Sequence, residues 1–270
     1  MRATVLVDNI GNDLVKGEWG LSILIENQDE KIILDMGSTN LFVQNAKKMG
    51  INLDDIDYGV LSHAHYDHAD GMKYFFDLNK SSKVYLQNSC KNGCFYKKWF
   101  FRKYIGIEKN ILKKYTDRIS FVSGDFKLNK GVYLISHKTK DLDKIGKLEN
   151  MYIKTKDKFI PDSFAHEQSL VFDTPDGLVI FNSCSHGGAD NIINEVAADF
   201  PGKKIKAIVG GFHLYKKSEK AVREISQKIK ATGVEQIYTG HCTGENQFNI
   251  MKDELGDMVH QLKVGLVMEF

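Results

Sequence analysis

Three histidines and an aspartate lie so close together after one predicted strand that they constrain how the chain can fold. His63, His65, Asp67 and His68 occupy six residues directly after the apolar run Tyr58–Leu61. Neutral imidazole nitrogens and carboxylate oxygens are common ligands of zinc and similar divalent ions. Residues two apart in an extended backbone point to the same side, so His63 and His65 can bind one ion. Asp67 and His68, at the turn into the next helix, can face a second ion. Surface histidines in a polar turn are the alternative, but three of the chain's nine histidines in six residues argue against it.

Short apolar runs alternate with amphipathic segments along the rest of the chain. Strands are predicted at Val5–Val7, Leu21–Ile25, Lys31–Leu34, Tyr58–Leu61, Lys83–Leu86, Ser169–Asp173, Leu178–Phe181, Ile205–Val209, Gln236–Thr239 and Leu266–Phe270. Helices are predicted from the N-cap Ser38 to Met49, and at Asp70–Leu78, Ile192–Phe200 and Ser218–Ala231. Early hairpins followed by strand–helix alternation favour a mixed sheet packed by helices, in the α/β or α+β class. No repeat or linker divides the chain, so we predict a single domain over residues 1–270.

The segment 88–118 breaks this alternation. Between Lys91 and Lys114 it holds eight Lys or Arg residues against one acidic residue, and aromatic residues lie between them. We expect a cap-like insertion, partly helical rather than a regular sheet element. One interpretation is a cap helix with its aromatic residues inward and a basic face in solvent. In the other, which is compatible with the first, Lys98, Trp99 and Arg102 contact a flat heterocycle that bears phosphate.

Composition excludes several classes of protein. No apolar run reaches about 18 residues, so we expect no spanning helix and no membrane partner. A net charge of +2 argues against a nucleic-acid partner. Four cysteines are too sparse for a disulfide scaffold, and Asp8 interrupts the amino terminus before a secretory signal could form. These features together favour a cytoplasmic protein that acts on a small molecule.

Three further histidines follow predicted strands. His186 and His241 lie beside glycine and His213 lies two residues after Gly211, and glycine permits close approach of backbone or ligand. Sites in open α/β sheets gather at the carboxyl ends of strands, so these histidines are candidates to complete the cluster. A hydrogen-bonded structural role is the alternative for each.

The run from His63 to His68 resembles the hallmark motif of the metallo-β-lactamase superfamily. Asp35, followed by Met36 and Gly37, resembles the acidic first motif of that superfamily. The residues at 184–187, 210–214 and 241–244 are similar to the branch named for 7,8-dihydropterin-6-methyl-4-(β-D-ribofuranosyl)aminobenzene 5′-phosphate synthase. The resemblance covers the whole chain and implies a four-layer αββα sandwich. It also implies two divalent metal ions at one edge, with zinc favoured and iron or manganese as alternatives.

The resemblance implies a ligand set for each ion. The first ion would be held by His63, His65 and His186, and the second by Asp67, His68 and His241. An alternative remains open in which His166 replaces His186 and either Cys184 or His186 bridges the ions. Asp35 would support a liganding imidazole, with capping of the next helix as its alternative role.

Such a site predicts a metal-dependent hydrolase or transferase for a small, phosphorylated or heterocyclic substrate. Two ions lower the pKa of bound water toward about 7 and so supply hydroxide. Asp67 would orient this nucleophile and accept its proton, and His213 would donate a hydrogen bond to an anionic group or act structurally. The alternatives are a nucleic-acid phosphodiesterase or ribonuclease of the same superfamily, and a non-catalytic metabolite sensor.

Overall fold

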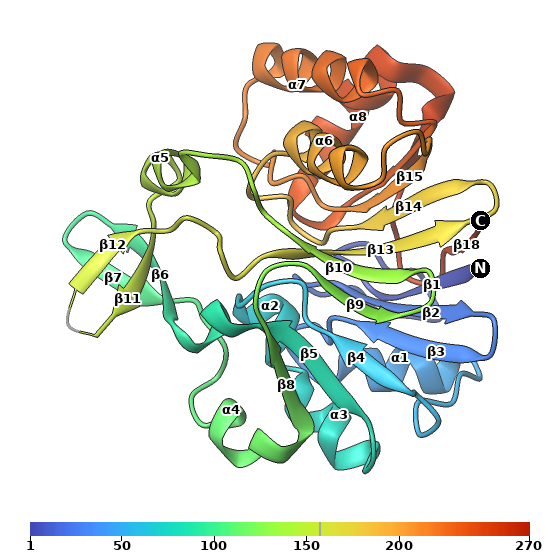
Figure 1. Cartoon of the computed structure of the whole chain (residues 1–270), viewed down its shortest axis with the longest axis vertical. Helices are drawn as coiled ribbons and strands as arrows, with labels where there is room; N and C mark the ends of the chain where they lie inside the picture. Colours follow the sequence, from blue (N-terminus) through green and yellow to red (C-terminus); the bar gives the residue numbers. More distant parts are fainter. Residues whose placement is uncertain (157) are drawn as a thin grey trace.

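Two seven-stranded sheets pack face to face in the computed structural model, which describes residues 1–156 and 158–270 (Figure 1). The first sheet has the strand order β18 (Val267–Glu269), β1 (Arg2–Val7), β2 (Ser22–Asn27), β3 (Glu30–Leu34), β4 (Tyr58–Val60), β5 (Lys83–Gln87), β8 (Ile119–Val122). The second has the order β17 (Val259–Gln261), β16 (Gln236–Thr239), β15 (Ile205–Gly210), β14 (Gly177–Phe181), β13 (Gln168–Thr174), β10 (Val132–Ser136), β9 (Phe126–Asn129).

The inner faces of the two sheets are apolar. Ile23 and Val60 of the first sheet belong to the same buried cluster as Leu170 and Val179 of the second. Side chains alternate between the faces of a strand, so each strand gives one set of apolar residues to this interior and another to the helix layer outside. Removal of these surfaces from water is the main force that holds the sheets together.

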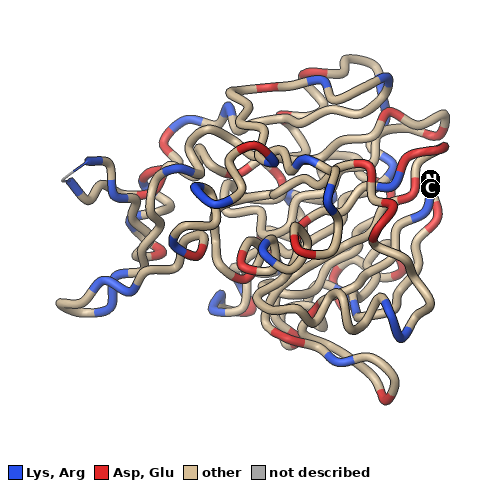
Figure 2. The backbone as a smooth tube through the Cα atoms, turned by 90° about the horizontal axis from the view of Figure 1, so that it is seen from below, with Lys and Arg blue, Asp and Glu red and all other residues tan. Residues whose placement is uncertain are grey.

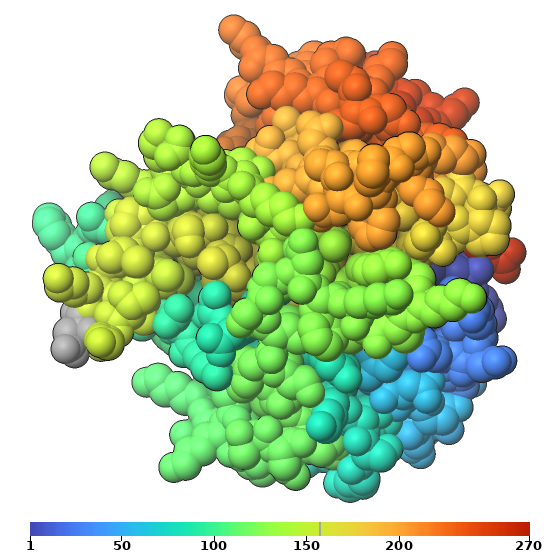
Figure 3. Space-filling model, in the orientation of Figure 1, coloured from blue at the N-terminus to red at the C-terminus, as the bar shows by residue number. Residues whose placement is uncertain are grey.

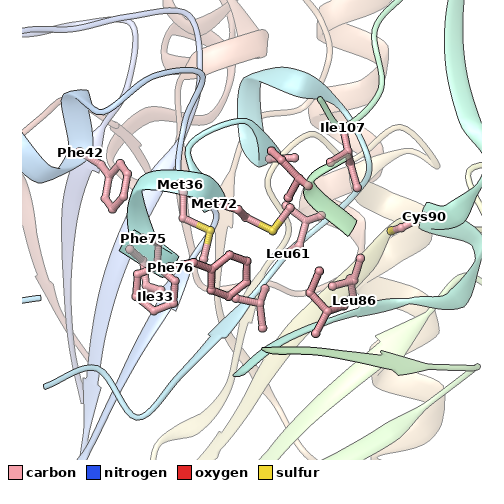
Figure 4. Close-up of a cluster of buried hydrophobic side chains, with 14 of the residues drawn as sticks. Ile33, Met36, Phe42, Leu61, Met72, Phe75, Phe76, Leu86, Cys90 and Ile107 are labelled. Atoms are coloured by element: carbon pink, nitrogen blue, oxygen red, sulfur yellow. The ribbon is translucent and has the colours of Figure 1, made fainter. Parts of the chain in front are cut away.

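Helices cover the outer face of each sheet. Helices α1 (Leu41–Lys48) and α3 (Met72–Leu78) pack on the first sheet, where Phe42 and Phe75 join Met36 and Leu61 in a buried cluster (Figure 4). Helices α6 (Ala189–Asp199), α7 (Glu219–Ala231) and α8 (Glu245–Leu255) cover the second sheet (Figure 1). The order helix, sheet, sheet, helix confirms the predicted αββα sandwich.

Each sheet contains a run of parallel strands. In the first sheet β3, β4, β5 and β8 are mutually parallel, and in the second β14, β15, β16 and β17 are parallel. Parallel neighbours end at the same edge, so the loops after β4, β14, β15 and β16 are available to build one site.

The segment 88–118 differs from its prediction. Its aromatic part forms strands β6 (Gly93–Lys98) and β7 (Phe101–Tyr104), which join β11 (Met151–Thr155) and β12 (Lys158–Pro161) in a third sheet of order β12-β11-β6-β7. Only the short helix α4 (Ile111–Lys114) and two single 3₁₀ turns fit the helical expectation. The prediction of a cap helix was therefore wrong. The two-residue turn Trp99–Phe100 has none of the usual turn residues, so the sequence does not indicate a hairpin there. The strand that pairs with β6, β11, lies about fifty residues further along the chain. The third sheet forms a lobe at the side of the sandwich (Figure 3).

Two smaller differences concern helices. Helix α1 begins after Asn40 rather than after Ser38, whose hydroxyl instead donates to the Trp19 carbonyl at 2.7 Å. Helices α5 (Leu142–Leu148) and α8 have no predicted counterpart. Among the residues that the structure describes, no helix has both the length and the apolar character needed to cross a bilayer.

Candidate metal centre

The first sheet contributes four predicted ligands. They follow β4 and enter the short helix α2 (Tyr66–Ala69): His63, His65, Asp67 and His68. The helix lies directly against the loop after β3, because the Met36 N–H donates to the His68 carbonyl at 2.9 Å. A Cβ atom at Gly71 would lie 1.9 Å from the Met36 carbonyl oxygen, so this close approach requires glycine.

The second sheet contributes loops after three parallel strands. Cys184 and His186 follow β14, His213 follows β15, and His241 follows β16. The backbone at Ser185, His213 and His241 is left-handed, with φ values of 50°, 50° and 46°. Such conformations cost on the order of 1–3 kcal/mol for residues other than glycine, and they cluster at functional sites.

His63, His65 and His186 form the first cluster across the two sheets. One ligand atom from each lies within 4.8 Å of the others. The buried Nε2 atoms of His63 and His65 and both ring nitrogens of His186 have no hydrogen-bond partner among the described residues. Burial and the neighbouring imidazoles lower the pKa of His63 and His186 well below the ordinary value, and burial and His166 lower the pKa of His65 to about 3. All three rings are therefore neutral at pH 7 and offer lone pairs that a divalent ion would satisfy.

Asp67, His68 and His241 form the second cluster. The Nε2 atoms of His68 and His241 are 3.1 Å apart, and Asp67 Oδ2 lies 3.5 Å from His241 Nε2. Burial opposes ionisation of Asp67, but His68 and His241 lower its pKa below the usual range. Burial also opposes a charged His241, yet the Cys242 and Asp67 side chains raise its pKa to about 9. This end of the site therefore favours positive charge, as a bound cation would supply.

Two cysteines lie between and beside these clusters. Cys184 Sγ is 3.3 Å from His68 Nε2, and it groups with His63 and His68 as a possible set of ligands. Cys242 Sγ is 3.4 Å from Cys184 Sγ and accepts a hydrogen bond from the His213 N–H at 3.3 Å. Cys184 therefore lies close to one histidine of each cluster. Cys242 was not predicted as a site residue, although its place directly after His241 was a usable signal.

Asp35 supports both clusters. Its carboxylate accepts from the Ser62 N–H and hydroxyl, both at 2.7 Å, and lies 2.7 Å from His68 Nδ1. The Ser62 hydroxyl also lies 2.8 Å from His63 Nδ1. Because a carboxylate only accepts, these contacts place protons on the Nδ1 atoms and leave both Nε2 atoms as ligands. Helix α1 starts after Asn40, so the geometry supports the imidazole-orienting role of Asp35 over the capping role.

Asp8 and Asn9, just after β1, hold the loop of His241. Asp8 Oδ2 accepts from the His241 N–H at 2.9 Å, and Asn9 Oδ1 lies 3.1 Å from His241 Nδ1. Neither residue was predicted from the sequence. An isolated Asp-Asn pair after a strand ordinarily indicates a turn, so no signal in the sequence distinguishes this pair from turn residues.

His166 differs from His186 in its contacts. Its Nδ1 accepts from the Ala64 N–H at 3.3 Å and its Nε2 lies 3.0 Å from Asp162 Oδ2, so both ring nitrogens have partners. His166 also groups with Cys94, Asp162 and His65 in a further buried cluster, which shares His65 with the first. The free ring nitrogens of His186 make it the better candidate for the first ion.

A buried ion pair network fixes the loop that carries His186. Glu167 accepts from the N–H groups of His186 and Gly187 at 3.1 and 3.3 Å, and its carboxylate also bonds His137 Nε2. The other ring nitrogen of His137 lies 3.1 Å from Glu195. Burial alone would lower the pKa of His137, but the hydrogen bonds and charges of the two glutamates raise it to about 9.

We therefore expect stability to fall in mildly alkaline solution. The unfolded-state pKa of histidine is about 6.5, so the stabilisation from charged His137 is complete below that pH and is lost as pH rises through about 9. The free energy of unfolding should decrease by up to about 3 kcal/mol over this interval. Urea denaturation at several pH values in this interval measures the change. The free energy of unfolding of His137→Asn should be lower and should vary less with pH. Equal slopes in both proteins would contradict this account.

A pocket of about 270 Å³ opens onto both clusters. Its lining includes the cluster residues and neighbouring cysteines His65, Asp67, Cys184, His186 and Cys242. Aromatic and basic residues also line it: Trp19, Tyr66, Tyr96, Lys103, Tyr215 and Lys216. His213 also lines the pocket, and its Nδ1 is buried without a hydrogen-bond partner among the described residues.

The predicted substrate residues lie elsewhere on the same hairpin. Lys98, Trp99 and Arg102 are not among the described residues that line this pocket. Tyr96 and Lys103, directly paired across β6 and β7, face it instead. Side chains alternate along a strand, so Arg102 points to the face opposite Lys103. Lys98 and Trp99 lie farther along the hairpin, at its turn.

Comparisons with known proteins agree with this geometry. A family model of the metallo-β-lactamase superfamily matches residues 20–143. The 7,8-dihydropterin-6-methyl-4-(β-D-ribofuranosyl)-aminobenzene-5′-phosphate synthase of Methanocaldococcus jannaschii is 26% identical over 272 residues, which cover 94% of this chain and 90% of that protein. The uncharacterized protein MJ0448 of the same organism is 28% identical over 247 residues, which cover 89% and 90% of the two chains.

A solved structure extends the similarity over the full length. Tm1679, a metal-dependent hydrolase of the β-lactamase superfamily, superposes with a TM-score of 0.86 and 30% identity, and the match covers 100% of this chain and 99% of that one. The sandwich, the clustered histidines and these similarities lead to one conclusion: the chain belongs to the metallo-β-lactamase superfamily.

Proposed function

We propose that the protein is a metal-dependent hydrolase or transferase with two divalent ions, acting on a small substrate that is phosphorylated or heterocyclic. The observation that carries this proposal is the set of buried imidazole nitrogens without partners, which face one another across the two sheets. Superfamily membership supports metal-dependent chemistry of the hydrolase kind. The relative named as a synthase supports transfer as the other reaction class.

The proposed ligand sets follow from the two clusters. His63, His65 and His186 would hold the first ion, and Asp67, His68 and His241 the second, with Cys184 between them. When bound, the ions supply Lewis-acid polarisation of a carbonyl or phosphoryl oxygen and acidify water. Imidazole and carboxylate ligands suit zinc, iron or manganese, and a cysteine ligand favours zinc or iron over manganese.

The other residues of the pocket have distinct proposed roles. Asp67 faces the pocket as a carboxylate and would orient water and accept its proton. His213 would donate a hydrogen bond to an anionic group of the substrate, since its buried Nδ1 has no described partner. Lys103 and Lys216 would pair with phosphate, and Trp19, Tyr96 and Tyr215 offer flat faces for a heterocyclic ring.

The experiment is removal and return of metal. Chelator-treated protein should lose turnover on a panel of phosphate ester, phosphodiester and lactone substrates, and zinc, iron(II) or manganese should restore it. Elemental analysis should give two ions per chain. Incubation with a dihydropterin diphosphate and a ribofuranosyl-aminobenzene phosphate separates coupling from hydrolysis. Protein that takes up no metal, or that keeps full turnover after chelation, would refute the proposal.

A further inference from the structure

The turn between β6 and β7 exposes three consecutive aromatic side chains. Trp99, Phe100 and Phe101, named here the aromatic tip, are 81%, 94% and 77% exposed. They lie at the end of a hairpin that projects from the sandwich (Figures 1 and 2). Cys94, at the base of the same hairpin, is buried. Contiguous exposed apolar surface of this kind marks an interaction site with a protein or a membrane.

The local geometry gives no folding reason for these residues. Two-residue hairpin turns favour Asn-Gly or Asp-Gly, because their backbone enters the left-handed region. Trp99 adopts a φ of 54° in this turn, which a bulky side chain seldom does. Water therefore disfavours all three aromatic side chains, and the backbone also disfavours Trp99, so the sequence of this hairpin suits a bound state better than the isolated fold.

Positive charge surrounds the tip. Lys97, Lys98 and Arg102, named here the basic collar, lie on the two strands immediately behind it (Figure 2). Lys97 is directly opposite Arg102 across the hairpin, an arrangement of like charges that destabilises a strand pair. Within residues 1–156 and 158–270, none of the three has a carboxylate oxygen within 4.0 Å. Arg102 instead lies over the Phe159 ring, 4.5 Å from its centroid.

We propose that this hairpin docks the protein on an anionic lipid bilayer, with the aromatic tip in the interfacial region and the basic collar at the headgroups. Tryptophan is enriched at the membrane–water interface, and phenylalanine is common on apolar faces that insert at the headgroup boundary. Each Lys or Arg near an anionic surface adds attraction. The hairpin ends in the uncharged aromatic tip and carries the basic collar directly behind it. This order matches that of the interfacial region and the anionic headgroups along the membrane normal. This proposal departs from the expectation of no membrane partner, which rested on the lack of an apolar run long enough to span a bilayer.

Two other occupants fit the same residues less well. Tip-to-tip association of two copies would bring two basic collars together. A single-stranded nucleic acid would stack its bases on flat aromatic faces along a groove, whereas these three side chains are consecutive at one tight turn. Both occupants remain distinct outcomes of the test below.

Vesicle binding by the full-length, metal-loaded protein tests the proposal. The chain has two tryptophans, so Trp19→Phe leaves Trp99 as the sole tryptophan reporter. Its emission should shift to shorter wavelength with vesicles of phosphatidylcholine plus phosphatidylglycerol, far less with phosphatidylcholine alone, and the shift should reverse in high salt. Co-sedimentation gives the partition coefficient for every variant.

Matched substitutions separate the two parts of the surface. Phe100→Ser with Phe101→Ser should lower partitioning at least tenfold. Neutralisation of the collar by Lys97→Gln, Lys98→Gln and Arg102→Gln should lower it about fivefold per charge. The controls Leu148→Ser, at an apolar residue 80% exposed, and Lys220→Gln should leave partitioning unchanged. Equal thermal midpoints would show that the variants fold.

Three results would overturn the proposal. The first is no partitioning into anionic vesicles at low salt. The second is salt-sensitive binding of single-stranded RNA that quenches Trp99, without binding of vesicles. The third is a dimer that Phe100→Ser and Phe101→Ser abolish, again without binding of vesicles. None of these results depends on whether the metal centre is catalytic.

Discussion

Alanine at position 63 will remove at least one of the two bound ions and lower turnover by more than about 100-fold. His63 is buried with an unpartnered Nε2 and lies close to ligand atoms of both clusters. Loss of a residue that merely supports a ligand typically costs 10–100-fold in metal affinity or activity, so loss of a ligand should cost more. Elemental analysis of dialysed protein should give at most one ion per chain for His63→Ala, and two for the wild type.

Cobalt(II) provides a readout that is independent of turnover. In the wild type, the visible spectrum should report ions held by imidazole, and His63→Ala should change both its intensity and the number of equivalents bound. His260→Ala is the matched control, because His260 lies on β17 and stacks on Tyr238, outside both clusters. Unchanged metal content in His63→Ala would remove the basis of the proposed site.

Asparagine at position 35 should weaken metal binding by about 10–100-fold while the fold is retained. The carboxylate accepts from Ser62 twice and from His68 Nδ1 once, and no other residue type offers so many acceptor positions in that space. An amide NH₂ in place of one oxygen would face a donor. His68 would then favour the tautomer with its proton on Nε2, the nitrogen needed for the ion. Competition titrations with a chromophoric chelator measure the two affinities.

Ser62→Ala distinguishes the two arms of this network. It breaks the link from Asp35 to His63 Nδ1 and leaves the link to His68 intact, so its effect should be smaller and should fall on the first ion. Asp257→Asn, at a fully exposed carboxylate, is the matched control and should have no effect. Wild-type affinity for both ions in Asp35→Asn would show that Asp35 does not set the tautomer.

Strand positions near the site could be predicted because their apolar runs are short and bounded by turn residues. The runs before His63, His186, His213 and His241 correspond to β4, β14, β15 and β16. The carboxyl ends of parallel strands lie at the same edge of a sheet, so histidines far apart in the sequence could be predicted to share one site. The structure brings those four histidines together from both sheets.

The supporting residues could not be predicted in the same way. Asp8, Asn9, Glu167 and His137 act through hydrogen bonds to the backbone or to one another, and partner choice depends on tertiary contacts that have no local pattern. Glu167 lies beside His166 in the sequence, yet its partners are His186, Gly187 and His137.

The hairpin of β6 and β7 was missed for a different reason. Its aromatic and basic residues fit an amphipathic helix, and its turn lacks glycine, asparagine and proline. Pairing with β11, which comes about fifty residues later, stabilises the strand against that local preference. Tertiary context therefore outweighs local propensity at this position.

The proposed ions would join loops that belong to opposite halves of the sandwich. With His63 and His65 on the chain that follows a strand of one sheet and His186 on a loop of the other, a bound ion would act as a reversible crosslink across the seam. An ion at about a thousandfold above its dissociation constant contributes about 4 kcal/mol to the folded state. Depletion of the metal would then open the seam to proteases, so the lifetime of the protein in a cell would follow the supply of its ion.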